Sequence, residues 1–179
     1  GGANLVTLPM TQDPLQALLQ RTWAPTLSVT GPTGKISEGS PGVFTVALSN
    51  TATSATSIAL TLGNTGSQDA TLGSDYASTM VVTYRRSSDN TVVTETVTNG
   101  SSISLAAGET SFQVRVDTTA DSPRVYEGDE HFKLTAATSW SSANDSATIT
   151  DDGTGKVYDN SGNATATTAD DDSSEERRV

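Results

Sequence analysis

The sequence predicts an all-β sandwich, and three of its properties support that prediction. Segments in which apolar and polar residues alternate recur along the chain, for example at 43–48 and 112–116, and a period of two is expected of strands with one buried face. Clusters of glycine, asparagine, aspartate and serine separate these segments, as turns require. Threonine and valine, which favour strands, are abundant.

Composition limits the class of function. A length of 179 residues fits one domain with appended segments. The formal net charge of -11 argues against a nucleic-acid partner, whose phosphates need a basic patch, and agrees with either cation binding or simple solubility. Because cysteine is absent, disulfide bonds cannot stabilise the fold, and a bound metal is another way in which a secreted domain can be stabilised.

No targeting or membrane segment is evident. The sequence contains no signal peptide and no apolar run long enough to span a bilayer. The start, Gly1-Gly2-Ala3, is typical of an excised fragment, so any targeting signal is expected elsewhere in a longer parent.

Residues 1–24 form the first region. Asp13-Pro14 fits a helix N-cap followed by proline at the first helical position. The sequence therefore predicts a short amphipathic helix, docked on the sandwich or belonging to a neighbouring module; a flexible linker is an equal alternative. The apolar residues at helix-like spacing are Leu15, Leu18, Leu19 and Trp23.

Residues 25–152 form the predicted sandwich. Many short strands separated by turn signals are typical of this architecture. One hairpin, between residues 78 and 102 with its turn near 85–90, is additional to a simple sandwich. The expected strands are 26–30, 43–48, 57–62, 76–84, 91–98, 103–105, 111–116, 131–137 and 147–150.

Residues 153–179 read as a polar linker to the next repeat. Within it, Val157 and Tyr158 are expected to contribute at most one edge strand. The segment ends in Ala169-Asp170-Asp171-Asp172 and a charged tail.

Acidic residues concentrate in the predicted loops, and strand parity places those loops at one end. If the chain crosses the sandwich once per expected strand, the loops near Glu38, Asp75 and Glu127 and the end of the last strand all reach the same end. Calcium accepts six to eight oxygen ligands with flexible geometry, whereas metals that prefer nitrogen or sulfur are disfavoured by one histidine and no cysteine. A calcium site is therefore favoured over the alternative, acidic residues that are merely common in solvated loops.

Five ordered motifs resemble the Calx-β family. Together they span about 25–152, and it is the ordered set that is specific. The motifs are Ser37-Glu38-Gly39, Gly73-Ser74-Asp75-Tyr76, Leu105-Ala106-Ala107-Gly108-Glu109-Thr110, Tyr126-Glu127-Gly128-Asp129-Glu130-His131-Phe132 and Ile149-Thr150-Asp151-Asp152.

The resemblance implies a seven-stranded, immunoglobulin-like antiparallel sandwich that holds Ca²⁺ in loops at one end. Two departures from the family pattern stand out. The first is Ser122-Pro123-Arg124, which interrupts the acidic pair that usually precedes the fourth motif and weakens Asp121 as a ligand. The second is the additional hairpin. Because it adds two strand passes, the loops that follow it still emerge at the expected end. The implied ligands are Glu38, Asp75, Asp121, Glu127, Glu130, Asp151 and Asp152.

The wider layout resembles repeats of RTX adhesins, giant bacterial surface proteins secreted by the type I route. Such repeats open like Pro25-Thr26-Leu27-Ser28-Val29 and close like Asp151-Asp152-Gly153-Thr154-Gly155. Asp170, Asp171 and Asp172 either bind calcium at the junction with the next repeat or form a solvated charge run.

The expected function is that of a calcium-binding structural module of a bacterial cell-surface adhesin, rigidified by calcium for adhesion or biofilm formation. Its expected partners are neighbouring repeats of the same polypeptide and a host or cell-surface ligand, without nucleic acid or direct membrane insertion. Its expected location is extracellular, on the bacterial cell surface. The main alternative is a calcium-dependent module that binds a peptide or carbohydrate, with Trp23 or Trp140 in the site. An enzyme is not expected, because His131 is the sole histidine and no Gly-x-Ser-x-Gly elbow occurs.

Overall fold

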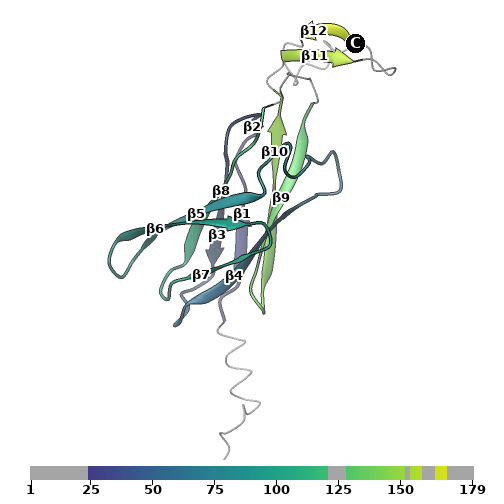
Figure 1. Ribbon diagram of the computed structural model, residues 1–179. Coiled ribbons are helices and arrows are strands. Elements are labelled where there is room, and N and C mark those ends of the chain that lie inside the picture. Colours follow the sequence, from purple (N-terminus) through teal and green to yellow (C-terminus); the bar gives the residue numbers. More distant parts are fainter. Residues whose placement is uncertain (1–23, 121–127, 152–153, 159–163, 169–179) are drawn as a thin grey trace, which may run out of the picture.

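The computed structural model describes residues 24–120, 128–151, 154–158 and 164–168. In these ranges the chain consists of strands, turns and loops, without a helix (Figure 1). The predicted N-terminal helix lies outside the described residues. None of the described residues belongs to a helix long and apolar enough to cross a membrane.

Ten of the strands form two five-stranded sheets. The first sheet has the order β1 (Leu27–Thr30), β3 (Gly42–Leu48), β8 (Ser111–Val116), β5 (Thr79–Arg86) and β6 (Thr91–Thr98). The second has the order β2 (Ile36–Ser37), β10 (Ser142–Thr150), β9 (Glu130–Ala137), β4 (Thr56–Gly63) and β7 (Ser102–Leu105).

The two sheets pack face to face, as the sequence predicts. Along β3 and β8 every second residue is buried, which is the pattern of strands with one face in a core. Phe44 of the first sheet meets Phe132 of the second edge-on, with ring centroids 5.8 Å apart. Tyr76 stacks on the same Phe132 ring at 4.3 Å. The core therefore joins the sheets through these three fully buried rings.

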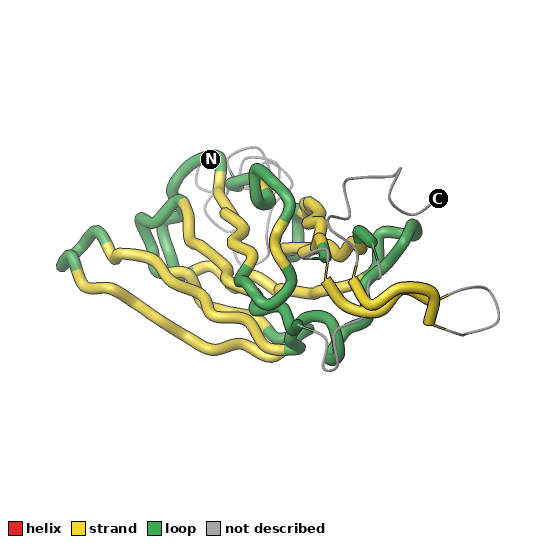
Figure 2. Tube along the Cα trace, turned by 90° about the horizontal axis from the view of Figure 1, so that it is seen from above, coloured by secondary structure: helices red, strands yellow, loops and turns green. Residues whose placement is uncertain are grey.

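The opening segment of the sandwich divides between the sheets. β1 pairs antiparallel with β3 in the first sheet, and β2 pairs parallel with β10 in the second. All other neighbours within the two sheets are antiparallel. Residues 27–37 thus link the two sheets at one side of the sandwich. Figure 2 views the strands of the sandwich from above.

Most strand boundaries lie within two residues of the sequence prediction, and three differences are larger. β5 begins at Thr79 rather than 76, because Tyr76 forms only isolated bridges, to Leu72 and Thr118. β10 begins at Ser142 rather than 147, because its polar first half is held by backbone pairing to β9 and needs no apolar side chains. The two-residue β2 is too short to leave a sequence pattern.

The C-terminal strands differ from the expected single edge strand. β11 (Thr154–Tyr158) pairs antiparallel with β12 (Ala164–Thr168) in a two-stranded sheet of their own. Val157 and Tyr158 are therefore in a strand, but its partner is β12 rather than a strand of the sandwich. The alanine and threonine residues of β12 carry too little apolar contrast to reveal a strand in the sequence.

The β5–β6 hairpin, which the sequence predicts as an addition to a simple sandwich, forms one edge of the first sheet. All eight residues of β5 pair with β6, whereas only Val81–Thr83 also pair with β8. The distal half of the hairpin therefore has no third strand, and it projects sideways in Figure 1.

A buried glutamate fastens the hairpin tip to the body. Glu109 is 7% exposed, and its Oε2 accepts hydrogen bonds from the backbone N–H and the hydroxyl of Ser87, at 2.6 and 2.7 Å. Nearby, the Tyr84 hydroxyl accepts one from the Ala106 N–H at 3.3 Å. Gly108 adopts a positive φ of 87° in the turn that presents Glu109, a conformation that favours glycine.

Replacing Glu109 by alanine should loosen this attachment. The change removes the carboxylate oxygen that accepts both hydrogen bonds and leaves the Ser87 N–H unpaired, a loss of about 1–3 kcal/mol in the free energy of unfolding. Urea denaturation should show the loss, and amide hydrogen exchange should accelerate at residues 87–90. Glu95→Ala is the matched control, because Glu95 is exposed on the same hairpin; equal losses for the two variants would contradict the fastening role.

Candidate metal centre

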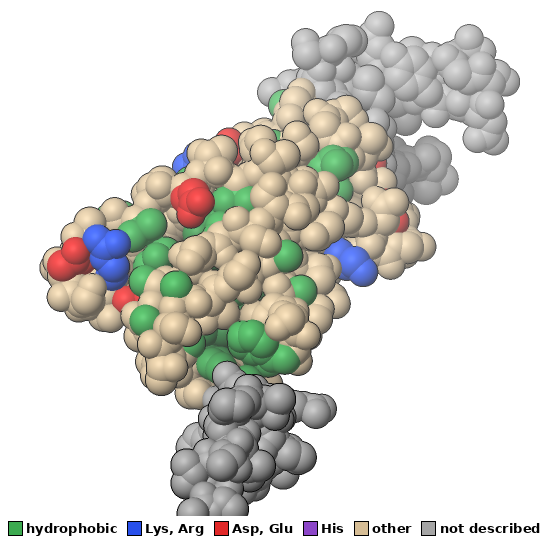
Figure 3. All heavy atoms as spheres, turned by 60° about the horizontal axis from the view of Figure 1, so that its bottom comes forward, with side chains coloured by type: hydrophobic (Ala, Val, Ile, Leu, Met, Phe, Trp, Pro, Cys, Tyr) green, Lys and Arg blue, Asp and Glu red, His purple; other side chains and the backbone are tan. Residues whose placement is uncertain are grey.

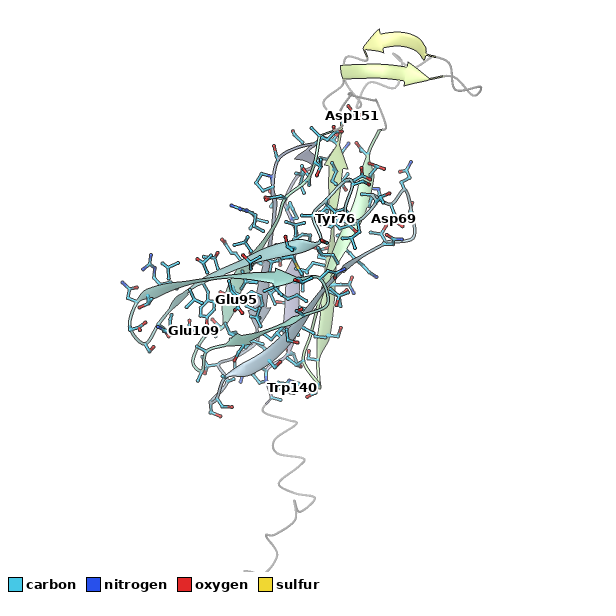
Figure 4. All side chains as sticks on the ribbon, in the orientation of Figure 1. Asp69, Tyr76, Glu95, Glu109, Trp140 and Asp151 are labelled. Atoms are coloured by element: carbon cyan, nitrogen blue, oxygen red, sulfur yellow. The ribbon has the colours of Figure 1, made fainter. Side chains whose placement is uncertain are left out.

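The strand directions bring acidic residues from separate loops to one end of the sandwich, here named the upper end. Glu38 follows β2 and Asp151 follows β10, and these strands run parallel. Glu130 begins β9, which runs antiparallel to β10. Asp75 precedes β5, which runs antiparallel to β8. Figure 4 shows Asp151 at this end.

Three of these carboxylate residues lie at the upper edge of the second sheet. Glu130 lies opposite the buried Ile149 in the register, and therefore on the core side of β9. Asp151 directly follows β10 and is itself buried. Glu38 directly follows β2, in a turn where its N–H donates to the Thr150 carbonyl. Glu38 and Glu130 are only partly exposed, which agrees with this placement at the upper rim of the core.

Asp151 is the most buried of the set. Its residue exposure is 5%, and the Glu38 N–H donates to the carbonyl of its neighbour Thr150 at 3.0 Å. Burial of an ionised carboxylate costs free energy unless hydrogen bonds or a cation compensate it. Asp151 is therefore a buried carboxylate at the upper end of the second sheet.

The Asp75 turn is rigid. The Asp75 Oδ2 accepts a hydrogen bond from the Thr71 N–H at 2.6 Å, and the Asp75 N–H donates to the Thr71 carbonyl at 2.8 Å. Gly73, with φ at 93°, donates its N–H to the Tyr76 carbonyl at 2.7 Å. Among the described residues, Asp75 makes no hydrogen bond through Oδ1, so one oxygen of a fixed carboxylate remains for a ligand role.

Tyr76 supports this turn from below. Its ring is fully buried against Phe132, and its hydroxyl has no hydrogen-bond partner among the described residues. Burial raises the pKa of Tyr76, and the negative charges of Asp69 and Asp75 raise it further. The tyrosine of the Gly-Ser-Asp-Tyr motif is thus a core residue that anchors the aspartate beside it.

Thr118 joins three loops of the upper end. Its hydroxyl oxygen accepts from the Gly39 N–H at 2.9 Å and donates to the Ser40 carbonyl at 2.6 Å. The next residue, Thr119, donates its N–H to the Asp75 carbonyl at 2.9 Å. Because Thr118 is 7% exposed, these bonds are sheltered from water. The loops that carry Glu38 and Asp75 are therefore tied to each other through the end of β8.

A lysine also lies at this end, which sequence reasoning missed. Lys35 Nζ is 2.7 Å from Asp129 Oδ2, and the Thr150 hydroxyl donates to Asp129 Oδ1 at 3.0 Å. Asp129 was not among the expected ligands, and its position directly before Glu130 was the only available signal. The pair places one positive charge among the acidic loops.

Asp69 belongs to a neighbouring loop and has a local role. Its carboxylate accepts from the Thr65 N–H and hydroxyl at 2.7 Å each and from the Gly66 N–H at 2.8 Å. The hydrogen bonds from Thr65 are the main cause that lowers the pKa of Asp69. The carboxylate is thereby committed to shaping the 65–69 turn.

The described residues form only part of the expected ligand set. Among them, no group of three acidic or histidine side chains is arranged closely enough to hold a metal ion. A complete calcium shell would therefore need further ligands. The expected ligands Asp121, Glu127 and Asp152, and the junction residues Asp170, Asp171 and Asp172, lie outside the described residues.

Comparisons with known proteins add little to this geometry. No protein-family profile and no curated protein matches the sequence. Among solved structures, a match is the sulfur carrier protein SoxY from Chlorobium limicola f thiosulfatophilum, at 10% identity and a TM-score of 0.30, covering 76% of this chain and 94% of that chain. A TM-score this low supports no argument about fold or function.

Substitution of Thr118 by valine tests the joined loops. The change keeps the shape of the side chain but removes the acceptor for Gly39 and the donor to Ser40. The free energy of unfolding should fall by about 1–3 kcal/mol, since buried polar groups lose their partners.

Thr119→Val is the matched control, because Thr119 is exposed and joins Asp75 only through its backbone. Its stability should stay within about 0.5 kcal/mol of the parent. Chemical denaturation of both variants measures the difference, and a neutral Thr118→Val would show that the loops do not depend on this hydroxyl.

Proposed function

We propose that this chain is a calcium-binding structural module of a bacterial cell-surface adhesin. The observation that supports it best is that Glu38, Asp75, Glu130 and Asp151, which come from four separate segments, all lie at the upper end of the sandwich. Calcium binds carboxylate oxygens supplied by separate loops, in a flexible shell of six to eight ligands.

Calcium suits this arrangement better than other metals. The candidate ligands are carboxylates at loop and strand ends, and calcium takes oxygen ligands in a flexible shell. The sole histidine, His131, has its Nδ1 3.0 Å from the Thr148 hydroxyl, and cysteine is absent. We propose that Glu127, Asp152 and, more weakly, Asp121 complete the set supplied by Glu38, Asp75, Glu130 and Asp151.

The strand order supports the proposed immunoglobulin-like, Calx-β-type architecture. An immunoglobulin sandwich places strands A, B, E and D in one sheet and C, F and G in the other. With β1 as A, β3 as B, β8 as E and β5 as D, the first sheet follows that order, and β4, β9 and β10 take the places of C, F and G. β6 and β7 are then additions at the two sheet edges.

As proposed, calcium would act structurally. A cation that binds only the folded state stabilises that state by linkage. Shared between loops of the upper end, it would stiffen the place where the chain leaves the sandwich after β10. In an adhesin built from repeats, that stiffness would hold neighbouring repeats in an extended array, with Asp170, Asp171 and Asp172 as candidate junction ligands. Neither catalysis nor a membrane-inserted role is part of the proposal.

Thermal unfolding with and without calcium tests the stabilising role. At a free calcium concentration one hundred times the dissociation constant, linkage adds about 2.7 kcal/mol, which raises the melting temperature by about 5–10 °C for a chain of this size. Circular dichroism melts in calcium and in excess chelator measure the shift. Identical melting temperatures would rule out structural calcium.

The ligand assignment has its own test. Glu127→Ala should weaken calcium binding at least tenfold by isothermal titration calorimetry, because a charged ligand is lost. Asp89→Ala should leave the affinity unchanged, since Asp89 lies in the hairpin turn at the other end and pairs with Arg86 at 2.9 Å. Equal weakening by both substitutions would argue against a site at the upper end.

A further inference from the structure

An exposed tryptophan marks the opposite end of the sandwich, where the chain enters it. Trp140 lies in the turn between β9 and β10 and is 48% exposed. Figure 4 shows it at the lower end of the sandwich. Its indole Nε1–H donates to the Pro25 carbonyl at 2.7 Å. The ring is thus fixed beside the residue that leads into β1.

The turn holds the ring in place. The Thr138 hydroxyl oxygen accepts from the Trp140 N–H at 3.2 Å and from the Ser141 N–H at 2.9 Å. The Thr138 N–H closes the turn by donating to the Ser141 carbonyl at 2.8 Å. The Ser141 hydroxyl in turn accepts from the Leu27 N–H at 2.9 Å. A large aromatic surface is therefore presented rigidly, so that binding to it costs little conformational entropy.

The surroundings of this ring are uncharged, although the chain has a net charge of -11. The turn 138–142, the entering residues 24–26 and the loop 49–52 contain no acidic or basic side chain. These segments are neighbours, because Thr26 and Ser49 exchange hydrogen bonds. In Figure 3 apolar side chains gather on the surface at the end that comes forward. The exposed Trp140 ring, among uncharged polar side chains, therefore suits a partner that offers an uncharged apolar face.

The preceding chain offers a complementary partner. Residues 15–23 contain only one charged side chain, Arg21, and their leucines recur at the spacing of one helix face. A helix this short is marginal in water by itself and depends on packing of its apolar face. The segment ends directly before Ala24 and Pro25, and Pro25 is the residue whose carbonyl the Trp140 indole contacts. Trp23 is only two residues from Pro25, within about 8 Å by chain geometry.

We propose that residues 15–23 of this same chain dock on the Trp140 surface through Leu15, Leu18 and Leu19. The docked segment would act as a strut that fixes the direction in which the chain enters the sandwich. This function concerns the lower end and is independent of calcium at the upper end.

Tryptophan fluorescence of the full chain tests the docking. The chain has two tryptophans, so Trp23→Phe leaves Trp140 as the sole reporter. In that background Trp140 should emit at shorter wavelength, and its acrylamide quenching constant should be at least twofold lower than after the further changes Leu18→Asn and Leu19→Asn.

The matched control replaces Ala17 and Gln20 by asparagine, which introduces the same residues on the opposite helix face. This control should retain the low quenching constant. Far-UV circular dichroism verifies that each variant keeps the sandwich, since all substitutions precede β1. Equal quenching in all variants would overturn the proposal, as would protection of Trp140 that disappears on dilution, because that result would assign the surface to a second copy.

Discussion

Burial of one face of each sheet against the other is the constraint on which the rest of this structure depends. Phe44, Tyr76 and Phe132 form the contact between the sheets, and every strand must keep its apolar side turned toward them. A one-residue slip in any strand would expose that side. The register is therefore fixed, and with it the end of the molecule at which each loop emerges and the face on which each terminal side chain lies.

This constraint gives the two ends of the sandwich different chemistry. At the upper end, the strand directions bring Glu38, Glu130 and Asp151 to one edge of the second sheet. There the Thr118 hydroxyl bonds the loop after Glu38, and the Thr119 N–H bonds the Asp75 carbonyl. At the lower end, the same strands turn through uncharged loops that fix Trp140 in an exposed position. The two proposals assign a cation to one end and an apolar segment of the same chain to the other, an arrangement that would give a module in an array a defined junction at each end.

The sequence predicted the features that depend on alternation and parity. The strand near 43–48 was recognisable because its buried and exposed residues alternate. Counting how many times the chain crosses the sandwich was enough to place Asp75 and Asp151 at the same end. Features held by hydrogen bonds escaped prediction, because they depend on contacts between distant residues. Neither the Lys35–Asp129 ion pair nor the hydrogen bond from the Ser87 N–H to Glu109 leaves a periodic pattern in the sequence. The polar start of β10 is specified by its backbone pairing with β9.

The most direct test of a cation-dependent upper end is a calcium titration of the ¹⁵N-labelled chain followed by amide chemical shifts. Calcium bound as proposed should shift the amides of Gly39, Asp75 and Asp151 and leave those of Asp89, Gly108 and Trp140 unchanged. Shifts spread over both ends, or none at millimolar calcium, would contradict the proposal that this end of the sandwich is built around a divalent cation.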